Sequence, residues 1–519
     1  MKREDAIQVL NEDILWDIII IGGGATGLGA AVDAASRGYK TLLIERYDFA
    51  SGTSSRSTKL AHGGVRYLAQ GDISLVLNAL EERGLMMKNA PHLVKNQKFV
   101  IPYYEWWGGP FYTIGLKIYD LMAGKLGLGS SEFISKEEVM EFIPNLIDDD
   151  LKGGVIYHDG QFDDSRLAIN LAQTATECGA TIINYCELIG LEKNDEGMVK
   201  GVKVRDNENG KEYIVQSKTV INACGVFVDD ILKLDDSNTP DKIVASQGVH
   251  IVLDTSFLLG DHAIMIPKTP DGRVLFAVPW HNKVIVGTTD TLMEDHSENP
   301  KALESEIDFI LETAAKYLCK APKREDILSV YAGLRPLLAP EKEGMDTKEI
   351  SRNHKIIISL SGLISIIGGK WTTYRHMAED LIEKAIFIGG LDTADCKTKT
   401  LKIHGYKEGP DFSDHLYVYG SDKEKLLKLI AENPDYSKKL DDELPYVEGQ
   451  VIWALRHEMA RKLEDVLARR TRALFLNAKA SVRMAPKVAG IMARELNKDS
   501  EWIEQEIKNY NEVAAAFLV

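Results

Sequence analysis

Three glycines near the N-terminus follow the spacing G-x-G-x-x-G. They are Gly22, Gly24 and Gly27, and the acidic Glu45 lies about 20 residues further along the chain. In such a turn the first glycine permits a tight bend, the second lets the backbone approach a pyrophosphate, and the third lets a helix pack on a strand. The helix N-terminus offers N–H groups and a positive dipole to phosphate, and the acid can bind a ribose hydroxyl. The pattern therefore predicts a dinucleotide site.

Two further segments indicate which dinucleotide is bound. Residues 51–59 form a polar loop rich in Ser and Thr, which is followed by His62, Gly63 and Gly64. A second glycine-rich turn, 366–373, comes in the last third of the chain. An NAD domain would instead continue as alternating strands and helices. Two such turns far apart in the sequence suit one long, extended cofactor, and we expect FAD.

The segments around these turns have the patterns of an α/β fold. Residues 16–21 are almost all apolar and predict a buried strand, a helix rich in small residues follows the glycines, and residues 41–44 predict a second strand. Between residues 244 and 288, short apolar runs predict successive strands of an antiparallel sheet over the flavin. Residues 451–473 have high helix propensity.

We therefore expect an α/β fold (α+β overall) with three parts. These are a Rossmann-like FAD-binding domain, an antiparallel-sheet substrate domain and a helical C-terminal domain, for which packing or oligomerisation is the default role. The expected ranges are 1–90, 151–235 and 334–390 for a discontinuous FAD-binding domain, 91–150 and 236–333 for the substrate or cap domain, and 391–519 for the C-terminal domain.

The composition argues against several other classes of protein. The formal net charge of −16 disfavours nucleic acid as the main partner, because phosphate backbones require clustered Lys and Arg. The five cysteines lack CxxC spacing, so we expect no metal site, no disulfide framework and a reducing compartment. The charged N-terminus lacks the apolar region of a signal peptide, and we expect no membrane span, which would need roughly 18 apolar residues.

Several longer stretches carry a resemblance to a known family. The stretches 22–27 and Asn222-Ala223-Cys224-Gly225 are common to many flavoproteins, whereas KLAHGGVRYL at 59–68, YAGLRPL at 331–337 and GGKWTTYR at 368–375 are far more specific. With these motifs the chain resembles the FAD-dependent glycerol-3-phosphate dehydrogenases, within the flavoproteins that include the D-amino-acid and sarcosine oxidases. The resemblance covers essentially the whole chain apart from a short charged N-terminal extension.

The resemblance implies oxidation of sn-glycerol 3-phosphate to dihydroxyacetone phosphate, with hydride transfer from C2 to flavin N5. The electrons would then pass to a quinone or, in the oxidase branch of the family, to oxygen. The chain has no clear insertion of the kind that some of the oxidases carry, which favours the quinone-linked dehydrogenase. A quinone acceptor implies a cytoplasmic protein held peripherally on the inner face of the cell membrane, and a homodimer is a further expectation.

A phosphate dianion as substrate requires Arg and Lys, because a guanidinium matches phosphate oxygens with two parallel hydrogen bonds. Arg66 and Arg335 lie in the family motifs among Gly, apolar and aromatic residues, where a poorly solvated Arg needs an anion. Lys370 follows the second glycine turn and either binds substrate or stabilises negative charge on the reduced flavin. Arg352 is the weakest of the four candidates.

Oxidation of an alcohol also requires an acceptor for the hydroxyl proton, and histidine has a suitable pKa. His62 precedes Gly63 and Gly64, and His250 closes the sequence QGVH. Both segments resemble the family's active-site segments. For either residue the alternative is a buried histidine whose partner is the backbone, and His62 alternatively contacts the flavin.

The expected cofactor contacts extend from both glycine turns. Cys186 is expected to contribute backbone only, near the adenine, whereas Ala223 and Gly225 belong to a second flavin-contacting strand by resemblance. The full set of expected contacts is Gly22, Gly24, Ala25, Thr26, Gly27, Glu45, Arg46, Thr53, Ser54, Ser57, Lys59, His62, Gly63, Gly64, Cys186, Ala223, Gly225, Gly333, Arg335, Gly369, Lys370, Trp371 and Thr372.

Other interpretations stay open. An oxidase would use oxygen, an amino-acid or amine oxidase would not need Arg66, Arg335 and Lys370 together, and a flavin-binding sensor would need no dianion site. The aromatic segment that contains Trp106, Trp107, Phe111, Tyr112 and Ile114 either packs as a cap over the flavin or enters a bilayer to reach quinone.

Overall fold

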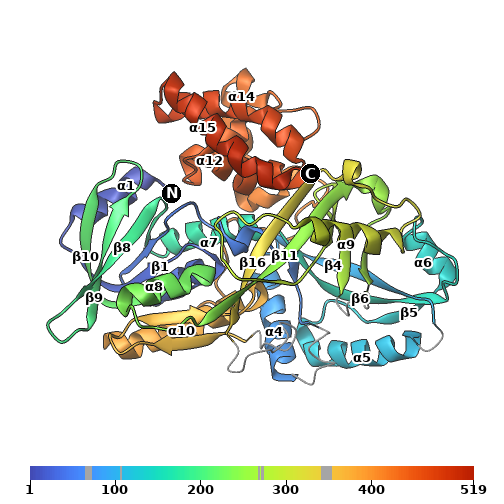
Figure 1. Cartoon of the computed structure of the whole chain (residues 1–519), viewed down its shortest axis with the longest axis horizontal. Helices are drawn as coiled ribbons and strands as arrows, with labels where there is room; N and C mark the ends of the chain where they lie inside the picture. Colours follow the sequence, from blue (N-terminus) through green and yellow to red (C-terminus); the bar gives the residue numbers. More distant parts are fainter. Residues whose placement is uncertain (65–72, 106–107, 267–268, 270–273, 340–352) are drawn as a thin grey trace.

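The computed structural model describes residues 1–64, 73–105, 108–266, 269, 274–339 and 353–519, and only the backbone of residues 108–114 and 125. Two large sheets lie side by side beneath a helical C-terminal region (Figure 1). One sheet is built around parallel strands and the other is almost entirely antiparallel. The expected fold class is confirmed.

The first sheet has a parallel centre in the order β18-β10-β1-β2-β7. The last four residues of β1 (Leu15–Ile21) are buried, as a central parallel strand covered on both faces requires. The register aligns Ile21 with Ile44 of β2 and with Asn222 of β10, so the carboxyl ends of these strands meet at one edge. The other strands of this sheet are β2 (Thr41–Ile44), β7 (Thr181–Ile183), β8 (Cys186–Lys193), β9 (Val199–Asp206), β10 (Glu212–Asn222), β17 (Lys355–Ile358) and β18 (Ile364–Ile367).

Helix α2 (Ala25–Arg37) packs between α7 (Asp164–Glu177) and α10 (Tyr374–Gly389). Small residues along α2 permit this close packing, since a Cβ at Gly29 would lie 2.8 Å from the ring of Tyr374. The helix ends at Gly38, whose φ of 102° is a left-handed conformation that favours glycine. The glycine turn is therefore followed by a helix that the sheet holds rigidly. The short helices α1 (Arg3–Gln8) and α8 (Val228–Asp235) complete this region.

The second sheet carries the long antiparallel pair β11–β16 at one end and β4–β6 near the other. Its only parallel pairing among the described strands is that of β4 with β12. The strands are β3 (Leu60–Ala61), β4 (Val94–Tyr103), β5 (Glu132–Ser135), β6 (Gly153–Phe162), β11 (Ile243–Asp254), β12 (Ala263–Ile266), β13 (Leu275–Trp280), β14 (Lys283–Gly287), β15 (Thr291–Met293) and β16 (Ser329–Leu338). Its helices are α4 (Ile73–Asn89), α5 (Gly108–Ala123), α6 (Lys136–Phe142) and α9 (Glu304–Ala315).

The strands divide the chain at points that differ from the expected domain boundaries. β6 and β3 pair within the second sheet, although their residues were expected in the FAD-binding domain. β16 continues without a break through residue 334, where a boundary was expected, because it pairs with β11 along its whole length. These domain boundaries are set by strand pairing between distant segments, which cannot be predicted from local composition.

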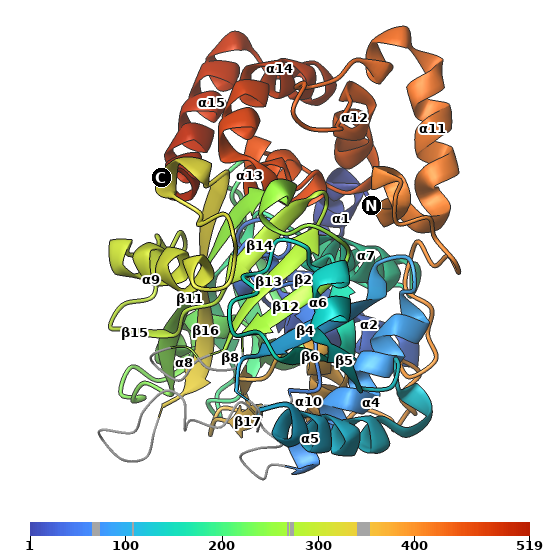
Figure 2. The same ribbon diagram turned by 90° about the vertical axis from the view of Figure 1, so that its right-hand side faces the viewer.

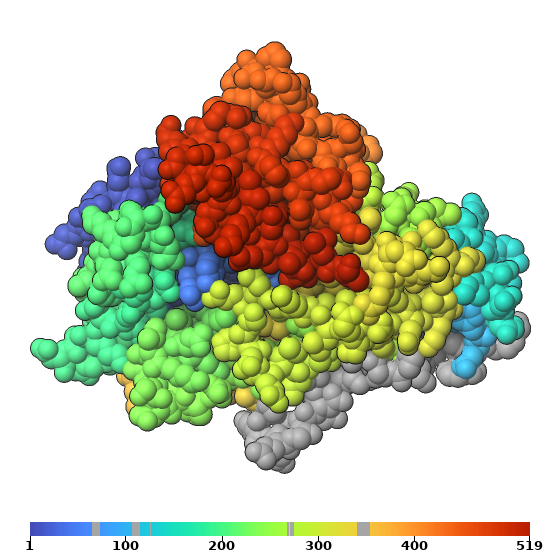
Figure 3. All heavy atoms as spheres, turned by 45° about the horizontal axis from the view of Figure 1, so that its top comes forward, coloured from blue at the N-terminus to red at the C-terminus, as the bar shows by residue number. Residues whose placement is uncertain are grey.

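The C-terminal region is helical, as expected. It contains α11 (Lys423–Glu432), α12 (Glu448–His457), the π-helix η10 (Asp465–Arg470), α13 (Ala473–Leu476), α14 (Ala478–Leu496) and α15 (Ser500–Ala514). Figure 2 shows α4 and α5 at the end of the molecule opposite these helices. A space-filling view shows a hollow beneath the C-terminal helices, with blue N-terminal residues at its floor (Figure 3).

Candidate active site

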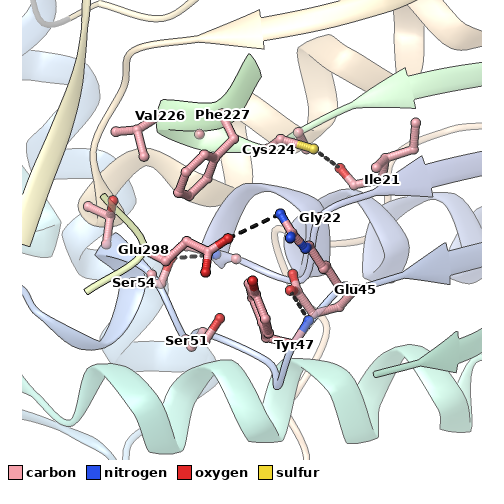
Figure 4. A pocket seen from close by; sticks show the side chains of 18 of the residues that line it. Ile21, Gly22, Glu45, Tyr47, Ser51, Ser54, Cys224, Val226, Phe227 and Glu298 are labelled. Carbon is pink, nitrogen blue, oxygen red and sulfur yellow. Dashed lines mark hydrogen bonds and ion pairs between the residues drawn. The ribbon is translucent and has the colours of Figure 1, made fainter. Parts of the chain in front are cut away.

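A cavity of about 740 Å³ lies at the edge where the parallel strands end. Its walls include Gly22 after β1, Glu45 after β2 and Ala223 after β10, together with Gly369 after β18 (Figure 4). Ligands of open α/β sheets bind at the carboxyl ends of the strands, and this cavity has that position. Its volume is in the range of small-molecule and cofactor sites, roughly 300–1,000 Å³.

The glycine turn cannot accommodate side chains. Gly22 has a φ of 108°, and a Cβ there would lie 2.7 Å from the carbonyl oxygen of Ala223. A Cβ at Gly27 would lie 1.9 Å from the carbonyl oxygen of Gly22, so this residue permits helix packing and does not line the cavity. Gly24 precedes α2 and has no side chain to cap it, so the positive helix end faces the cavity for a phosphate, apart from the N–H of Ala25, which is bound to Ser54.

The carboxylate of Glu45 is held by the backbone. It accepts hydrogen bonds from the N–H groups of Gly23 at 2.6 Å and Tyr47 at 2.8 Å, and burial raises its pKa. Arg46 lies at the rim and forms ion pairs with Glu187 at 3.2 Å and with Glu298 at 3.1 Å. Glu298 follows the second sheet's β15, so this pair connects the two sheets across the rim.

The polar loop at 51–59 and the late glycine-rich turn meet at the part of the cavity away from the rim formed by Glu45 and Arg46. The indole N–H of Trp371 donates to the carbonyl of Ser54 at 2.8 Å, and the hydroxyl of Ser54 accepts from the N–H of Ala25 at 2.9 Å. The backbone N–H of His62 donates to the hydroxyl of Thr372 at 3.2 Å. The polar loop and the late glycine turn therefore surround one space, as a single extended cofactor requires.

His250 and Arg335 lie on one face of the β11–β16 pair. The register places His250 opposite Tyr331 and Arg335 opposite Ser246, with Gly248 opposite Gly333 between them. A Cβ at Gly333 would lie 2.9 Å from Cβ of Arg56, so the loop at 53–58 lies directly against this face. The cofactor loop at 53–58 therefore packs on this face between the two candidate residues, where the paired glycines leave room for Arg56 and for the Arg335 guanidinium.

The imidazole of His250 is buried and stacks on Tyr331, with ring centroids 4.8 Å apart. Its Nε2 is hydrogen-bonded to the Thr58 hydroxyl at 2.9 Å, whereas its Nδ1 has no partner within the described ranges. Burial, followed by the charges of Lys59 and Arg335, places the pKa of His250 well below its usual value. The ring is therefore neutral at neutral pH.

Arg335 is held by the segment after β14. Its Nη2 donates to the hydroxyl of Thr288 at 3.1 Å and to the carbonyl of Thr289 at 3.2 Å, and its Nη1 lies 3.5 Å from Asp290. The side chain is 22% exposed and so remains accessible to a small anion. These contacts orient the guanidinium along the sheet face.

Most of the expected cofactor contacts line the cavity. Those that do so are Gly22, Gly24, Ala25, Thr26, Glu45, Arg46, Thr53, Ser54, Cys186, Ala223, Gly225, Gly369, Lys370 and Trp371. Those placed outside its lining are Gly27, Ser57, Lys59, His62, Gly63, Gly64, Gly333, Arg335 and Thr372. Of the remaining candidates, His250 is also outside the lining, and Arg66 and Arg352 lie outside the described residues.

Lys59 and Ser57 differ most from their expected role. The ammonium of Lys59 is completely buried and pairs with Asp164 at 2.6 Å, and burial lowers its pKa to about 7. The hydroxyl of Ser57 donates to the same carboxylate at 2.7 Å. Both side chains therefore point to α7 rather than to the cavity, because the buried Asp164 requires charged or polar partners. Gly63 has a packing role, since a Cβ there would lie 2.6 Å from the hydroxyl of Tyr119.

The C-terminal helices contribute lining residues that the sequence did not indicate. They are Lys462, Glu464, Arg469, Glu506, Asn509, Tyr510, Glu512 and Val513. Tyr47, Glu187 and Glu298 at the rim were also missed. None of these residues belongs to a nucleotide-binding motif, and only the basic run at residues 469–472, of the sequence RRTR, stood out as a cluster of charge.

Comparisons with known proteins agree with this geometry. Residues 17–375 match the family model described as FAD dependent oxidoreductase, and residues 364–503 match the C-terminal domain of alpha-glycerophosphate oxidase. The mitochondrial glycerol-3-phosphate dehydrogenase of Bos taurus is 40% identical over 98% of this chain and 74% of its own length. That of Arabidopsis thaliana is 39% identical over 99% of this chain and 88% of its own length.

Solved structures agree with these sequence matches. The glycerol-3-phosphate dehydrogenase from Bacillus halodurans complexed with FAD has a TM-score of 0.81 and 28% identity, over 99% of this chain and 97% of that one. The L-alpha-glycerophosphate oxidase from Mycoplasma pneumoniae has a TM-score of 0.58 and 16% identity, covering 75% of this chain and 98% of that one, and shares the fold. The glycine cradle, the cavity and these matches identify FAD as the cofactor, and the chain belongs to the glycerol-3-phosphate dehydrogenases of the FAD-dependent oxidoreductase family.

Proposed function

We propose that this protein oxidises sn-glycerol 3-phosphate to dihydroxyacetone phosphate and passes the electrons to a quinone. FAD, when bound, accepts hydride from C2 of the substrate. The observation that carries the proposal is the placement of His250 and Arg335 on one sheet face, with the cofactor loop at 53–58 against that face. Such a face combines a neutral proton acceptor with a cation for phosphate.

In this proposal Arg335 binds the substrate phosphate. Its guanidinium is oriented by Thr288 and Thr289 and stays partly exposed, so it can form charge-assisted hydrogen bonds to an entering dianion. Lys370 lines the cavity beside Gly369 and supplies a second positive charge to the substrate or to the reduced flavin. Arg66 and Arg352 are proposed as further phosphate ligands on the sequence alone.

The proton acceptor in this proposal is a histidine. His250 is neutral and has an available Nδ1, whereas His62 is joined through its backbone to Thr372 beside the late glycine turn. Replacing each by Asn and measuring anaerobic flavin reduction separates them. The variant that lacks the base should reduce flavin slowly while still binding the substrate.

The experiment that tests the proposal is anaerobic addition of sn-glycerol 3-phosphate to the purified flavoprotein. Rapid bleaching of the oxidised-flavin absorbance, absent with glycerol or with D-amino acids, is the expected result. A flavin-loaded protein that does not bleach would refute the substrate assignment. If air reoxidises the reduced flavin as rapidly as a soluble quinone does, the protein is an oxidase and the assignment as a quinone-linked dehydrogenase is wrong.

A quinone acceptor requires contact with a membrane, and we propose α5 as the contact. Ile118 and Leu121 on this helix are 46% and 80% exposed, at the end of the molecule opposite the C-terminal helices. Within the described ranges, no helix has the length and apolarity needed to cross a bilayer. Sedimentation with vesicles that contain anionic lipid, for the protein and for Leu121→Asp, tests this attachment.

A further inference from the structure

The π-helix η10 of the C-terminal region lies against two loops that border the FAD cavity. One is the loop 45–50 after β2, and the other contains Tyr185 between β7 and β8. Both loops contribute lining residues, as does η10 through Arg469. π-helical turns are rare and often lie at functional sites.

The first contact is a buried ion cluster centred on Asp48. Its carboxylate accepts hydrogen bonds from Nε of Arg469 at 2.6 Å and from Nη1 and Nη2 of Arg470 at 2.6 and 2.9 Å. All three side chains are almost completely buried. Burial raises the pKa of Asp48, but the two guanidinium groups outweigh it and hold this pKa at about 2.

The second contact joins Tyr185 to Asp465. The phenol donates to the Asp465 carboxylate at 2.6 Å, and that carboxylate also accepts from Arg469 at 2.8 Å. The backbone N–H of Tyr185 donates to the carbonyl of Tyr47 at 2.8 Å. One turn of η10 therefore holds both loops, and the loops hold each other.

The loop 45–50 in turn holds the glycine turn. The N–H of Gly23 donates to Glu45 at 2.6 Å, and the carbonyl of Gly23 accepts from the N–H of Ala50 at 2.9 Å. The ion pairs of η10 with Asp48, the backbone of the loop 45–50 and its hydrogen bonds to Gly23 thus connect η10 to the turn that faces the cofactor.

We propose that the C-terminal helical region is part of the FAD site and that η10 slows FAD release by fixing the loop 45–50 and Tyr185. Asp48, Tyr185 and Asp465 are positioning residues in this arrangement. A loop that is already ordered before binding loses less conformational entropy when the cofactor binds, so the cofactor is held more tightly. The C-terminal region then has a role in cofactor binding in addition to packing.

The test compares FAD release from holoenzyme variants. Tyr185→Phe deletes one hydroxyl and keeps the ring, and Asp48→Asn keeps the shape but removes the charge. Since a hydrogen bond to a charged group contributes enough for roughly a tenfold or greater change in an equilibrium, we expect FAD dissociation to accelerate about tenfold in Tyr185→Phe. The rate is measured from the rise in flavin fluorescence after dilution.

Tyr419→Phe is the matched control. Like Tyr185, Tyr419 is a buried tyrosine, but it belongs to the C-terminal region, its hydroxyl accepts from Gln450 at 3.2 Å, and it lies outside the cavity lining. We expect this variant to release FAD at the wild-type rate, whatever its effect on the thermal midpoint. Wild-type release from both Tyr185→Phe and Asp48→Asn, or equal acceleration in Tyr419→Phe, would overturn the proposal. A protein that purifies without flavin would instead contradict the cofactor assignment itself.

Discussion

His250 shows how the surroundings of one residue determine its chemistry. Stacking on Tyr331 removes water from one side of the ring, and Lys59 and Arg335 add positive charge nearby. Both effects favour the neutral imidazole, which is the form that can take a proton from an alcohol. The same burial and positive charge that keep the imidazole neutral also make it a weaker base, since a general base works best with its pKa near the operating pH.

The low pKa of His250 predicts a pH-dependent contribution to stability. Below its ordinary pKa of about 6.5 the unfolded chain takes up a proton that the folded protein does not, so the free energy of unfolding falls by up to about 1.4 kcal/mol per pH unit. Urea unfolding of wild type and of His250→Asn, at about pH 7.5 and 5.5, measures this term. The variant should lose less stability on acidification, and equal losses would contradict the assigned shift.

Arg335 is predicted to contribute mainly to substrate binding. Arg335→Gln should raise KM for sn-glycerol 3-phosphate by about 100-fold, because it removes charge-assisted hydrogen bonds worth roughly 1.5–3 kcal/mol. Arg324→Gln is the control, since this Arg pairs with the exposed carboxylates of Glu304 and Asp308 on α9. Steady-state kinetics decides the matter, and a fall in kcat with unchanged KM would place Arg335 elsewhere in the reaction.

At the scale of elements, the first strand, turn and helix form one unit whose function depends on glycines, which have no side chain. Gly22 and Gly38 both have φ values near +100°, one before α2 and the other at its end. Only Gly22 is also crowded, since nothing lies within 4 Å of a Cβ at Gly38. A substitution at Gly38 therefore tests the cost of the backbone conformation alone, whereas a substitution at Gly22 adds a steric clash.

Gly22→Ala should abolish stable FAD binding, whereas Gly38→Ala should cost about 1–2 kcal/mol of folding stability and retain the cofactor. The difference arises because a methyl group at residue 22 would push the turn away from Ala223. The flavin-to-protein absorbance ratio of each purified variant checks this. Equal flavin content in the two variants would show that crowding at Gly22 has no effect on the site.

At the scale of the whole molecule, buried ion pairs join the C-terminal helices to the first sheet's helices. Arg166 on α7 forms a bidentate pair with Glu458 at 2.7 and 2.8 Å, and Arg472 pairs with Asp164 at 2.9 Å. Charges so deeply buried are costly unless paired, so they impose one orientation of the C-terminal region. That orientation brings η10 to the cavity.

Removing one partner of a buried pair should destabilise the protein far more than removing a surface charge. Arg166→Met removes the bidentate partner of the buried Glu458, which keeps only the Trp453 N–H at 3.0 Å and the longer contact with Arg470 at 3.9 Å among the described residues, with an expected loss of about 3 kcal/mol. Arg483→Met removes a half-exposed ion pair with Asp441, with an expected loss of about 0–1 kcal/mol. Denaturant unfolding of both variants tests the contrast, and similar midpoints would show that the interface tolerates loss of the bidentate partner.

The sequence by itself determined the cofactor site at its glycine turns. The G-x-G-x-x-G spacing, the apolar strand and the acid after the second strand are local features, and local backbone geometry dictates their residue types. The motifs around Arg335 and Lys370 likewise indicated positive charge near the flavin. The expected strands and the helical C-terminal region followed from periodicity and propensity, which also act over short distances.

Only the tertiary structure decided what distant segments do to one another. The register of β11 with β16 put His250 and Arg335 on one face, and the pairing of β16 moved the expected boundary at 334. Lys59, which the sequence placed at the cofactor, turned to the buried Asp164, and η10 became a wall of the cavity. These outcomes depend on strand pairing and charge compensation between segments far apart in the chain. Such contacts leave no signature in the local sequence of either segment.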